Sequence, residues 1–444
     1  MKVPLAGWGR FPRLRSELIG AGSPAAARAA TEAAQGLIAR GSGRAYGDAA
    51  VGVEQTLSLS GLRRLLAFDA AAGLLTAEAG VPLAEVIAFA LPRGFYPYVV
   101  PGTQAVSIGG AIAADVHGKN HHREGGFGHY VTRLVLAAPD GSLVSCGPDE
   151  NTELFRHTLG GMGLTGTIVE ATIRLRPVET GRIRQHTVAA PNLTAAIAAL
   201  EASESATYSV AWIDCIARGK AMGRSLVYTG EHAALSDLPA GTPVLPPRGK
   251  ELPFPPLPFE VPGFVLNPLA MKAFNRLYWR QGRRADGQDR LVPEESYFFP
   301  LDRIRDWNRM YGGRGFTQHQ CVIPTERAPA ALGEMLGRIT RAGSASFLAV
   351  LKKLGAGAGT LSFPLPGFTL ALDFPIRKRT FRLLDELDEI VVRHGGRLYL
   401  AKDATQTRST FAAGYPAAAQ FRAFRHAIDP ERRLCSHLAR RLDL

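Results

Sequence analysis

The chain has 444 residues, 46% of them hydrophobic and 20% charged, which is enough apolar material for two folded domains or one domain with a large insertion. The formal charge of +13 favours an anionic partner such as a nucleotide or a phosphorylated substrate. Because the basic residues are dispersed and form no block of five or six like charges, we do not expect a nucleic-acid-binding tail.

The first 180 residues alternate helical segments with short strands. Residues 24–36 predict an alanine-rich helix that ends at a glycine, and the segment after it enters a glycine-rich turn at 41–48. Further strands are predicted over 55–60, 73–80 and 167–177, helices over 83–91 and 153–159, and a hairpin over 129–146.

A second domain is expected to begin after about residue 180. Its predicted elements are a mixed segment at 211–216, strands over 319–324, 346–355, 368–375 and 397–403, and a helix over 379–394. The proline density of residues 238–268 excludes helix and interior strand and predicts a long surface loop. Its apolar side chains leave two interpretations open, a loop pinned to the core or a lid for a lipid-like substrate. The whole pattern indicates an α+β fold with many antiparallel strand pairs.

Four cysteines, Cys146, Cys215, Cys321 and Cys435, are far apart and form no C-x-x-C pair. This spacing favours neither a metal cluster nor a disulfide framework. The N-terminal segment does not resemble a signal peptide, and no stretch reaches the ~20 apolar residues of a spanning helix. We therefore expect a cytoplasmic protein and leave peripheral membrane contact open.

A literal G-x-G-x-x-G occurs at residues 161–166. A dinucleotide-binding turn of the Rossmann type must follow a strand and open a helix, so that the helix N-terminus meets the pyrophosphate. Here a predicted helix precedes the glycines and a predicted strand follows them. We reject the Rossmann interpretation.

Two other glycine-rich segments are better suited to phosphate. RGSGRAYGD (40–48) and PGTQAVSIGG (101–110) let backbone N–H groups approach an anion without interference from Cβ atoms. AADVHGKNHH (113–122) follows directly. The spacing of His117 and His121 invites a metal site, but Gly118 would break the helix that such a pair needs, and no third ligand is evident. We predict no metal.

These segments, together with GGMGLTG (160–166) and LYLAKD (398–403), resemble the vanillyl-alcohol-oxidase-type flavoprotein superfamily, and within it the oxidases that act on polyprenyl-phosphoryl ribose. The resemblance covers nearly the whole chain. It implies a two-domain PCMH-type FAD-binding fold, with an FAD domain from residues 1–180 plus 396–444 and an antiparallel-sheet substrate domain from residues 181–395. A histidine often binds the flavin covalently in relatives, but Ala45 and Tyr46 stand at that place here. Noncovalent FAD is therefore implied.

The resemblance also implies the site. The residues expected to contact FAD are Arg40, Gly41, Ser42, Gly43, Arg44, Ala45, Tyr46, Gly47, Asp48, Gly102, Thr103, Ser107, Ile108, Gly109, Gly110, Ala114, Asp115, Val116, His117, Ile168 and Tyr399. Lys402, Tyr46 and His117 are the candidate catalytic residues, with Lys402 the first choice beside the flavin. Gln318, Gln320, Lys352 and Thr369 are expected to contact the sugar and its phosphate.

The implied reaction is oxidation of the 2′-hydroxyl of a polyprenyl-phosphoryl ribose to a 2-keto sugar. A separate NAD(P)H-dependent short-chain reductase would complete epimerisation to arabinose, a step of cell-wall arabinan synthesis. Two alternatives stay open: a soluble alditol or sugar-lactone oxidase that uses oxygen, and a non-catalytic protein that binds an anionic glycan or a nucleotide.

Overall fold

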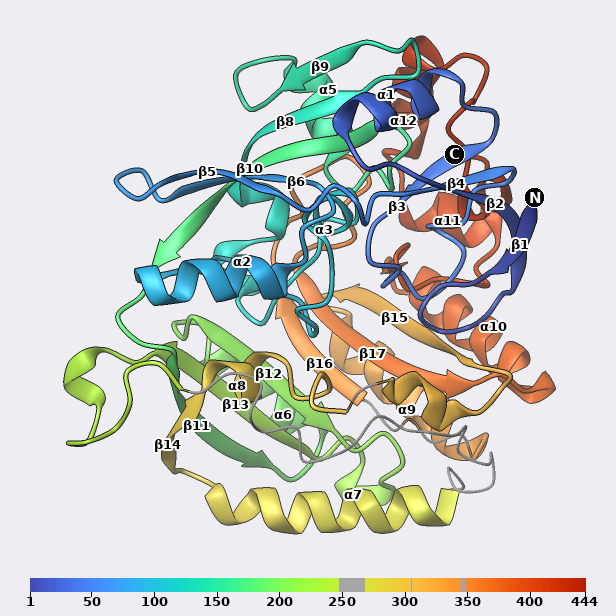
Figure 1. Cartoon of the computed structure of the whole chain (residues 1–444). Coiled ribbons are helices and arrows are strands. Elements are labelled where there is room, and N and C mark those ends of the chain that lie inside the picture. Colours follow the sequence, from blue (N-terminus) through green and yellow to red (C-terminus); the bar gives the residue numbers. More distant parts are fainter. Residues whose placement is uncertain (247–267, 305, 344–345, 347–348) are drawn as a thin grey trace.

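The computed structural model describes residues 1–246, 268–304, 306–343, 346 and 349–444. Three sheets organise this part of the chain (Figure 1). The first sheet has the order β1-β2-β4-β3, with β1 at Lys2–Leu5, β2 at Leu14–Gly20, β4 at Gln55–Ser58 and β3 at Leu37–Arg40. In it β4 runs parallel to both β2 and β3, whereas β1 and β2 are antiparallel.

The second sheet is antiparallel and is built around the long strand β10. Its order is β5 (Leu65–Asp69), β6 (Leu74–Glu78), β10 (Thr167–Pro177), β8 (Val131–Ala137) and β9 (Leu143–Cys146), and β7 (Phe95–Pro97) pairs with the far end of β10. The predicted strand at 167–177 and the predicted hairpin at 129–146 are confirmed. Alternation of apolar and polar residues along β10 gives one buried face, which is the strand signature in the sequence.

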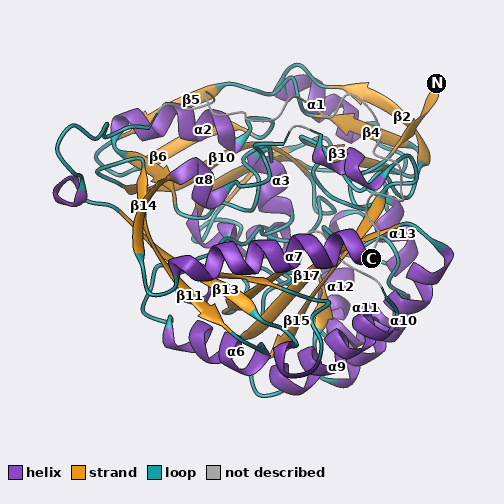
Figure 2. Cartoon of the chain, turned by 90° about the horizontal axis from the view of Figure 1, so that it is seen from below, coloured by secondary structure: helices purple, strands orange, loops and turns teal. Residues whose placement is uncertain are grey.

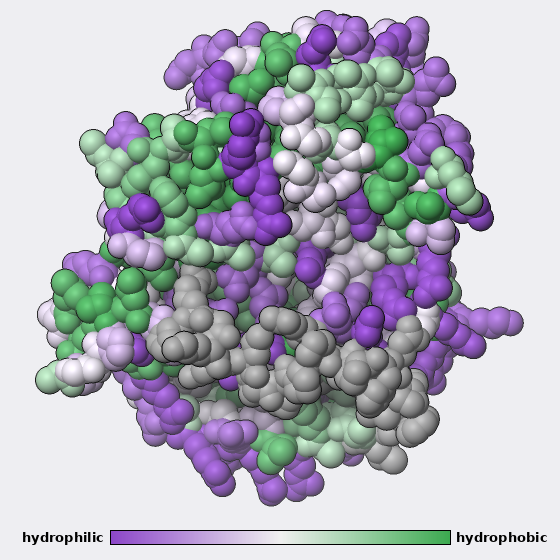
Figure 3. Space-filling view, viewed as in Figure 1, coloured by the Kyte–Doolittle hydropathy of each residue, from purple (hydrophilic) through white to green (hydrophobic). Residues whose placement is uncertain are grey.

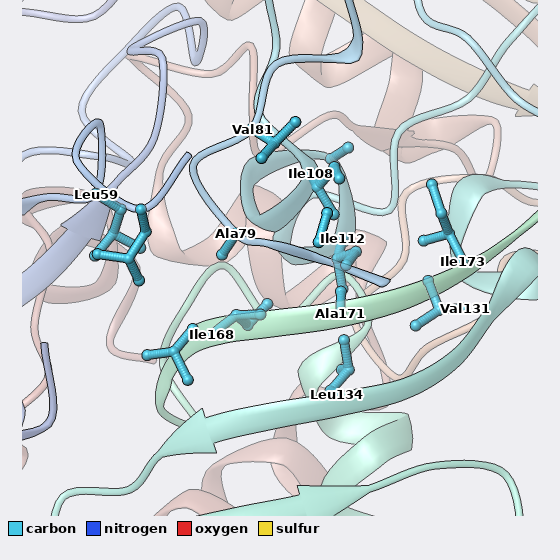
Figure 4. Packing of buried hydrophobic residues seen from close by; sticks show 14 of the residues in the cluster. Leu59, Ala79, Val81, Ile108, Ile112, Val131, Leu134, Ile168, Ala171 and Ile173 are labelled. Carbon is cyan, nitrogen blue, oxygen red and sulfur yellow. The ribbon is translucent and has the colours of Figure 1, made fainter. Parts of the chain in front are cut away.

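Besides the short helix α4 (His121–Glu124), four helices complete this part of the fold. They are α1 (Pro24–Glu32), α2 (Leu83–Ala90), α3 (Ile108–Ala113) and α5 (Thr152–Thr158). Figure 4 shows the core that forms where α3 packs on the second sheet, with Ile108 and Ile112 facing Ile168 and Ala171. The helix can lie this close because residue 109 is a glycine: a Cβ atom there would be 2.9 Å from the Cβ of Ala79.

The third sheet has eight antiparallel strands. Its order is β14 (Asp289–Pro293), β11 (Arg182–Ala190), β13 (Ser225–His232), β12 (Tyr208–Ile213), β16 (Ala349–Leu354), β17 (Gly367–Pro375), β15 (Phe316–Pro324) and β18 (Arg397–Leu398). Helices α6 (Leu193–Ala202), α9 (Ala328–Arg341) and α10 (Lys378–Arg393) share a hydrophobic core with this sheet. The chain closes with α11 (Arg408–Gly414), α12 (Ala418–Ile428) and α13 (His437–Leu442), which pack near the first sheet (Figure 1).

The predicted strand over 397–403 is wrong beyond Leu398. Residues 399–403 form a tight turn, in which the backbone N–H groups of Lys402 and Asp403 both donate to the carbonyl of Tyr399, at 2.9 and 3.0 Å. The Asp403 carboxylate then accepts the backbone N–H of Thr405 at 2.8 Å. Carboxylates that accept bonds from the backbone two residues on favour turns, so the chain continues as a turn after Asp403 and does not return to a strand.

The proline-rich stretch falls mostly outside the described residues. Residues 238–246 contain no helix or strand, as expected, and residues 247–267 lie outside the described part of the chain. Helix α7 then begins at Pro268 and runs to Gly282 along the outer side of the third sheet (Figure 2).

Candidate active site

One large cavity, of about 1150 Å³, has a lining that includes residues from all three sheets. Sites for a single drug-sized ligand are ~300–1,000 Å³, so this cavity has room for a dinucleotide-sized cofactor together with part of a second ligand.

Most of the residues that the sequence singled out line this cavity. They are Gly41, Ser42, Gly43, Arg44, Ala45, Tyr46, Gly102, Thr103, Ser107, Gly109, Gly110, Ala114, Val116, His117, Ile168, Gln318, Gln320, Lys352, Thr369, Tyr399 and Lys402. Segments from both ends and the middle of the chain are therefore brought to one place.

Arg40, Gly47, Asp48, Ile108 and Asp115, which were also expected to contact the cofactor, do not line the cavity. Arg40 donates to the carbonyl of Ala6 at 2.9 Å, and Ile108 is fully buried in the core. The side chains of Arg40, Asp48, Ile108 and Asp115 pack and form contacts behind the loops that line the cavity, and so support those loops.

Of these five residues, Asp115 accepts hydrogen bonds from the largest number of separate loops. Its buried carboxylate accepts the backbone N–H of Gly128 at 2.9 Å, the backbone N–H of Ala358 at 3.1 Å and the hydroxyl of Ser362 at 2.6 Å. The side chain therefore ties three separate loops together, and its polar atoms are occupied by the protein itself.

The backbone of the first glycine loop (residues 40–48) packs directly against the backbone of the turn at 399–403. The backbone N–H of Tyr46 donates to the carbonyl of Ala401 at 2.9 Å, and a Cβ atom on Gly47 would lie 1.8 Å from the carbonyl oxygen of Asp403. No L side chain fits into that gap. The glycine thus lets the loop and the turn approach each other at backbone distance.

This contact gives a first prediction. Gly47→Ala should lower the free energy of unfolding by about 3 kcal/mol, the upper end of the usual cost of overpacking, because the clash is with backbone. Chemical denaturation followed by tryptophan fluorescence would measure the change. Gly22→Ala is the matched control, since a Cβ atom there meets nothing within 4 Å. Equal stability of the two variants would contradict the assignment.

The first glycine loop also has the geometry of an anion cradle. Gly43 has a φ of +66°, which L side chains rarely adopt, and a Cβ atom on Gly41 would meet the hydroxyl of Ser107 at 1.9 Å. Arg44 stacks on Trp8 at 4.0 Å, and its buried Nε atom makes no hydrogen bond to any described residue. Close backbone approach and a buried cation with an unused donor fit the pyrophosphate of a dinucleotide.

Three neighbouring strands form the floor of the opposite part of the cavity. Side chains alternate between the two faces of a strand, so Gln318 and Gln320 on β15, Thr369 on β17 and Lys352 on β16 all face the cavity. The side chain of Gln318 also donates to Asp373 at 2.6 Å. Amides, a hydroxyl and an ammonium group in one layer can hydrogen-bond the hydroxyls and the phosphate of a sugar phosphate.

His117 is buried in the cavity wall. Burial holds the pKa of His117 well below its ordinary value, and Lys352 lowers it further. The amide nitrogen of Gln320 donates to His117 Nε2 at 2.9 Å, which leaves the ring proton on Nδ1, an atom with no partner among the described residues. His117 can therefore offer one N–H to a ligand.

Lys402 lies over the ring of Tyr46, with 3.4 Å between its Nζ atom and the ring centroid. Burial lowers the pKa of Lys402 below the usual lysine range and raises the pKa of nearby Asp373. Burial also raises the pKa of Tyr46 well above its ordinary value. A lysine in this setting can change protonation near neutral pH, which is the requirement for a group that takes up or returns a proton.

Lys119 was not singled out by the sequence, although it stands inside the HGKNHH segment. It lines the cavity, its ammonium group donates to the carbonyl of Tyr297, and burial lowers its pKa to about 7, with a further contribution from Lys352. Burial alone lowers the pKa of Lys352 to about 8. Neither lysine forms an ion pair with a described carboxylate, so an anionic ligand would stabilise the charged form of both.

A group of aromatic side chains in the cavity lining, the aromatic wall, was also not predicted from the sequence. Trp212, Tyr228 and Tyr278 line one part of the cavity, and the rings of Trp212 and Tyr278 lie 4.7 Å apart. Nothing local in the sequence marks these residues, because Tyr278 lies on α7 and the other two lie on strands of the third sheet.

The histidines that suggested a metal point to different partners. His121 Nδ1 accepts the backbone N–H of Gly355 at 2.9 Å, and His122 Nε2 lies 3.0 Å from the carbonyl of Ala206. Within the described ranges, no group of three or more His, Cys, Asp or Glu side chains is placed to hold a metal ion. The four cysteines are free thiols.

Comparison with known proteins gives two kinds of match. Residues 24–147 match the family of FAD binding domains. The decaprenylphosphoryl-β-D-ribose oxidase of Mycolicibacterium smegmatis is 37% identical over 99% of this chain and 97% of its own length. Shorter matches include the D-arabinono-1,4-lactone oxidase of Yarrowia lipolytica, 30% identical over 26% of this chain and 22% of its own length, and the human Δ(24)-sterol reductase, 30% identical over 27% and 23%.

Proposed function

Because the chain belongs to the decaprenylphosphoryl-β-D-ribose oxidase family of FAD-dependent oxidoreductases, we propose that it oxidises the 2′-hydroxyl of a polyprenyl-phosphoryl ribose to a 2-keto sugar. The observation that carries the proposal is the composition of the cavity. Amide side chains suited to sugar hydroxyls stand beside Lys119 and Lys352, two half-buried lysines that lack a carboxylate partner among the described residues. The lactone oxidases match only about a quarter to a third of the chain, which favours the phosphorylated substrate over a free sugar.

The proposal includes noncovalent FAD, held by the loops at 41–46 and 102–110. His117 is the one histidine among the described residues of the cavity lining, no cysteine occurs among them, and His117 Nε2 already accepts a hydrogen bond from Gln320. The FAD domain would comprise residues 1–180 plus 396–444, and the substrate domain residues 181–395.

When bound, FAD supplies the acceptor for the hydride, with its two electrons, that leaves the carbinol carbon. The protein must orient that C–H bond and move the hydroxyl proton. Gln318 and Gln320 would hold sugar hydroxyls, and the His117 Nδ1–H group would donate to a substrate oxygen. Lys402 has two possible roles. In its neutral form it would take the hydroxyl proton of the substrate, and in its protonated form it would stabilise the negative charge that develops on the reduced cofactor.

A test of the phosphate contact uses the pKa of Lys352. The phosphodiester of the substrate keeps one negative charge across neutral pH, whereas Lys352, with a pKa of about 8, loses its positive charge as pH rises. Substrate should therefore bind more tightly at pH 6.5 than at pH 9. Lys352→Met should weaken binding about 10- to 100-fold at pH 6.5, the contribution of one charge-assisted hydrogen bond, and reduce the pH dependence to the part that Lys119 contributes.

Binding is measured by titrating the flavin spectrum with a 2′-deoxy analogue of the substrate, which has no 2′-hydroxyl to be oxidised. Lys353→Met is the matched control, because Lys353 pairs with Glu204 at 3.0 Å and does not line the cavity. Unchanged affinity in Lys352→Met would remove this residue from the phosphate site.

The substrate has consequences for partners and location. A 2-keto sugar that is to become an arabinose needs a reductase, and an NAD(P)H-dependent short-chain reductase would serve. None of the described helices is long and apolar enough to cross a bilayer. A cytoplasmic protein in peripheral contact with the membrane that carries its lipid-linked substrate is the location that we propose.

The proposal is tested by the purified protein. It should be yellow with a flavin spectrum, and a polyprenyl-phosphoryl ribose should bleach that spectrum anaerobically while free alditols do not. Faster bleaching by free sugars would favour a soluble sugar oxidase, and a colourless protein that takes up no FAD would indicate a binding protein. Release of the flavin on acid precipitation would support noncovalent binding.

A further inference from the structure

Helix α7 carries a basic outer face. Lys272, Arg276, Arg280 and Arg284 are four residues apart, so they form one stripe along the helix and just past its end, and all four are exposed. No Asp or Glu occurs in α7, and none of the four side chains forms an ion pair with a described residue. Beside the stripe Leu277 is 65% exposed, more than any other described leucine.

The inner face of the same helix is fixed to the third sheet. Met271 is buried, and the Asn275 amide donates to Asp214 at 2.7 Å. The Tyr278 hydroxyl lies 3.3 Å from that of Tyr228, and both rings line the cavity. The inner face of α7 therefore contributes Tyr278 to the aromatic wall of the cavity, and its outer face is on the surface of the molecule.

Figure 2 shows α7 lying across the sheet on this side of the protein, and in Figure 3 the corresponding lower edge is largely hydrophilic with a hydrophobic patch within it. A helix of 15 residues is about 22 Å long. Cations next to an exposed leucine on a rigid helix match the requirements of an interfacial helix, which places charges among anionic headgroups and an apolar side chain among acyl chains. A purely electrostatic partner such as a nucleic acid would not use the leucine.

We propose that the outer face of α7, defined by Lys272, Arg276, Leu277 and Arg280, docks this oxidase on an anionic lipid membrane, and that the polyprenyl chain of the substrate enters along the wall formed by Trp212, Tyr228 and Tyr278. The inference rests on the proposed function for the source of the lipid. The docking itself concerns only the surface, so it can be tested apart from catalysis.

The test is co-sedimentation of the FAD-loaded protein with vesicles of phosphatidylglycerol and phosphatidylcholine, or of phosphatidylcholine alone, at low salt. The wild-type protein should bind the anionic vesicles and not the neutral ones. The combined variant Lys272→Gln, Arg276→Gln and Arg280→Gln should bind about 100-fold more weakly, since each basic residue near an anionic surface contributes about a factor of five. Leu277→Asp should also weaken binding.

The matched control removes three exposed cations from another helix, α10: Lys378→Gln, Arg379→Gln and Arg382→Gln. It changes the net charge equally and should keep wild-type affinity. Equal loss in both triple variants would indicate a nonspecific effect of charge, and no binding by the wild type would overturn the proposal. A dimer in light scattering that dissociates in the α7 variant would overturn it in favour of self-association.

Anaerobic bleaching by a water-soluble, short-chain prenyl-phosphoryl ribose separates the two proposals. Bleaching without vesicle binding would contradict the proposed docking surface and leave the proposed substrate standing. Vesicle binding without bleaching would support the docking surface and contradict the proposed substrate.

Discussion

Replacing Lys402 by methionine is expected to leave FAD bound and to slow flavin reduction by the substrate about a thousandfold, within the range for loss of a proton-transfer or charge-stabilising group. Lys402 is half-buried beside Tyr46 and Asp373, where it can change its charge near neutral pH. Methionine fills a similar volume but can neither take a proton nor carry a charge. Anaerobic stopped-flow measurement of flavin bleaching gives the rate.

A second variant separates the two roles of Lys402. Arginine keeps the positive charge but is not deprotonated in proteins. If the charge is what matters, Lys402→Arg should recover most of the rate and keep the wild-type flavin potential. If Lys402 takes the proton, the arginine variant should be as slow as the methionine variant. Reduction at the wild-type rate in Lys402→Met would refute the catalytic assignment.

The second large effect is expected at Arg441, which joins the two segments that flank the cofactor site. Its guanidinium contacts Asp48 at 2.9 Å and Asp403 at 2.9 Å, and donates to the carbonyl of Gln406 at 2.7 Å. Both carboxylates are almost fully buried. Arg441→Met would leave them unpaired, so the free energy of unfolding should fall by about 3–5 kcal/mol, the usual cost of removing one partner of a buried pair.

FAD affinity should fall in the same variant, because Asp48 ends the first glycine loop and Asp403 follows Lys402. Urea denaturation with and without FAD measures the stability, and equilibrium dialysis measures the affinity. Arg440→Met is the matched control: Arg440 is exposed, its guanidinium lies 3.1 Å from His437 Nδ1, and it forms no ion pair with a described carboxylate. A variant of Arg441 as stable as that control would show that the pair of aspartates does not depend on it.

Short-range patterns in the sequence were sufficient for much of the secondary structure and for the rejection of a Rossmann site. The glycines at 161–166 do follow helix α5 and precede strand β10, the reverse of the order that pyrophosphate binding requires. Helices and strands such as α10 and β17 were predicted because their hydrophobic periods, 3.6 and 2, depend only on neighbouring residues. The turn at 399–403 was missed because backbone bonds to the carbonyl of Tyr399 close it, and the side-chain pattern of Leu-Tyr-Leu does not reveal them.

The composition of the site was decided by tertiary structure. Gln320 and His117, which share a hydrogen bond, are 203 positions apart, and Lys402 meets Tyr46 only because the last turn of the third sheet packs against the first glycine loop. The same packing placed Lys119 in the cavity and directed the side chains of Arg40 and Asp115 away from it. The sequence by itself determined which loops could approach phosphate, because a missing Cβ atom is a local property. Which side chains reach the cavity depends on contacts between distant strands, and only the folded chain contains those contacts.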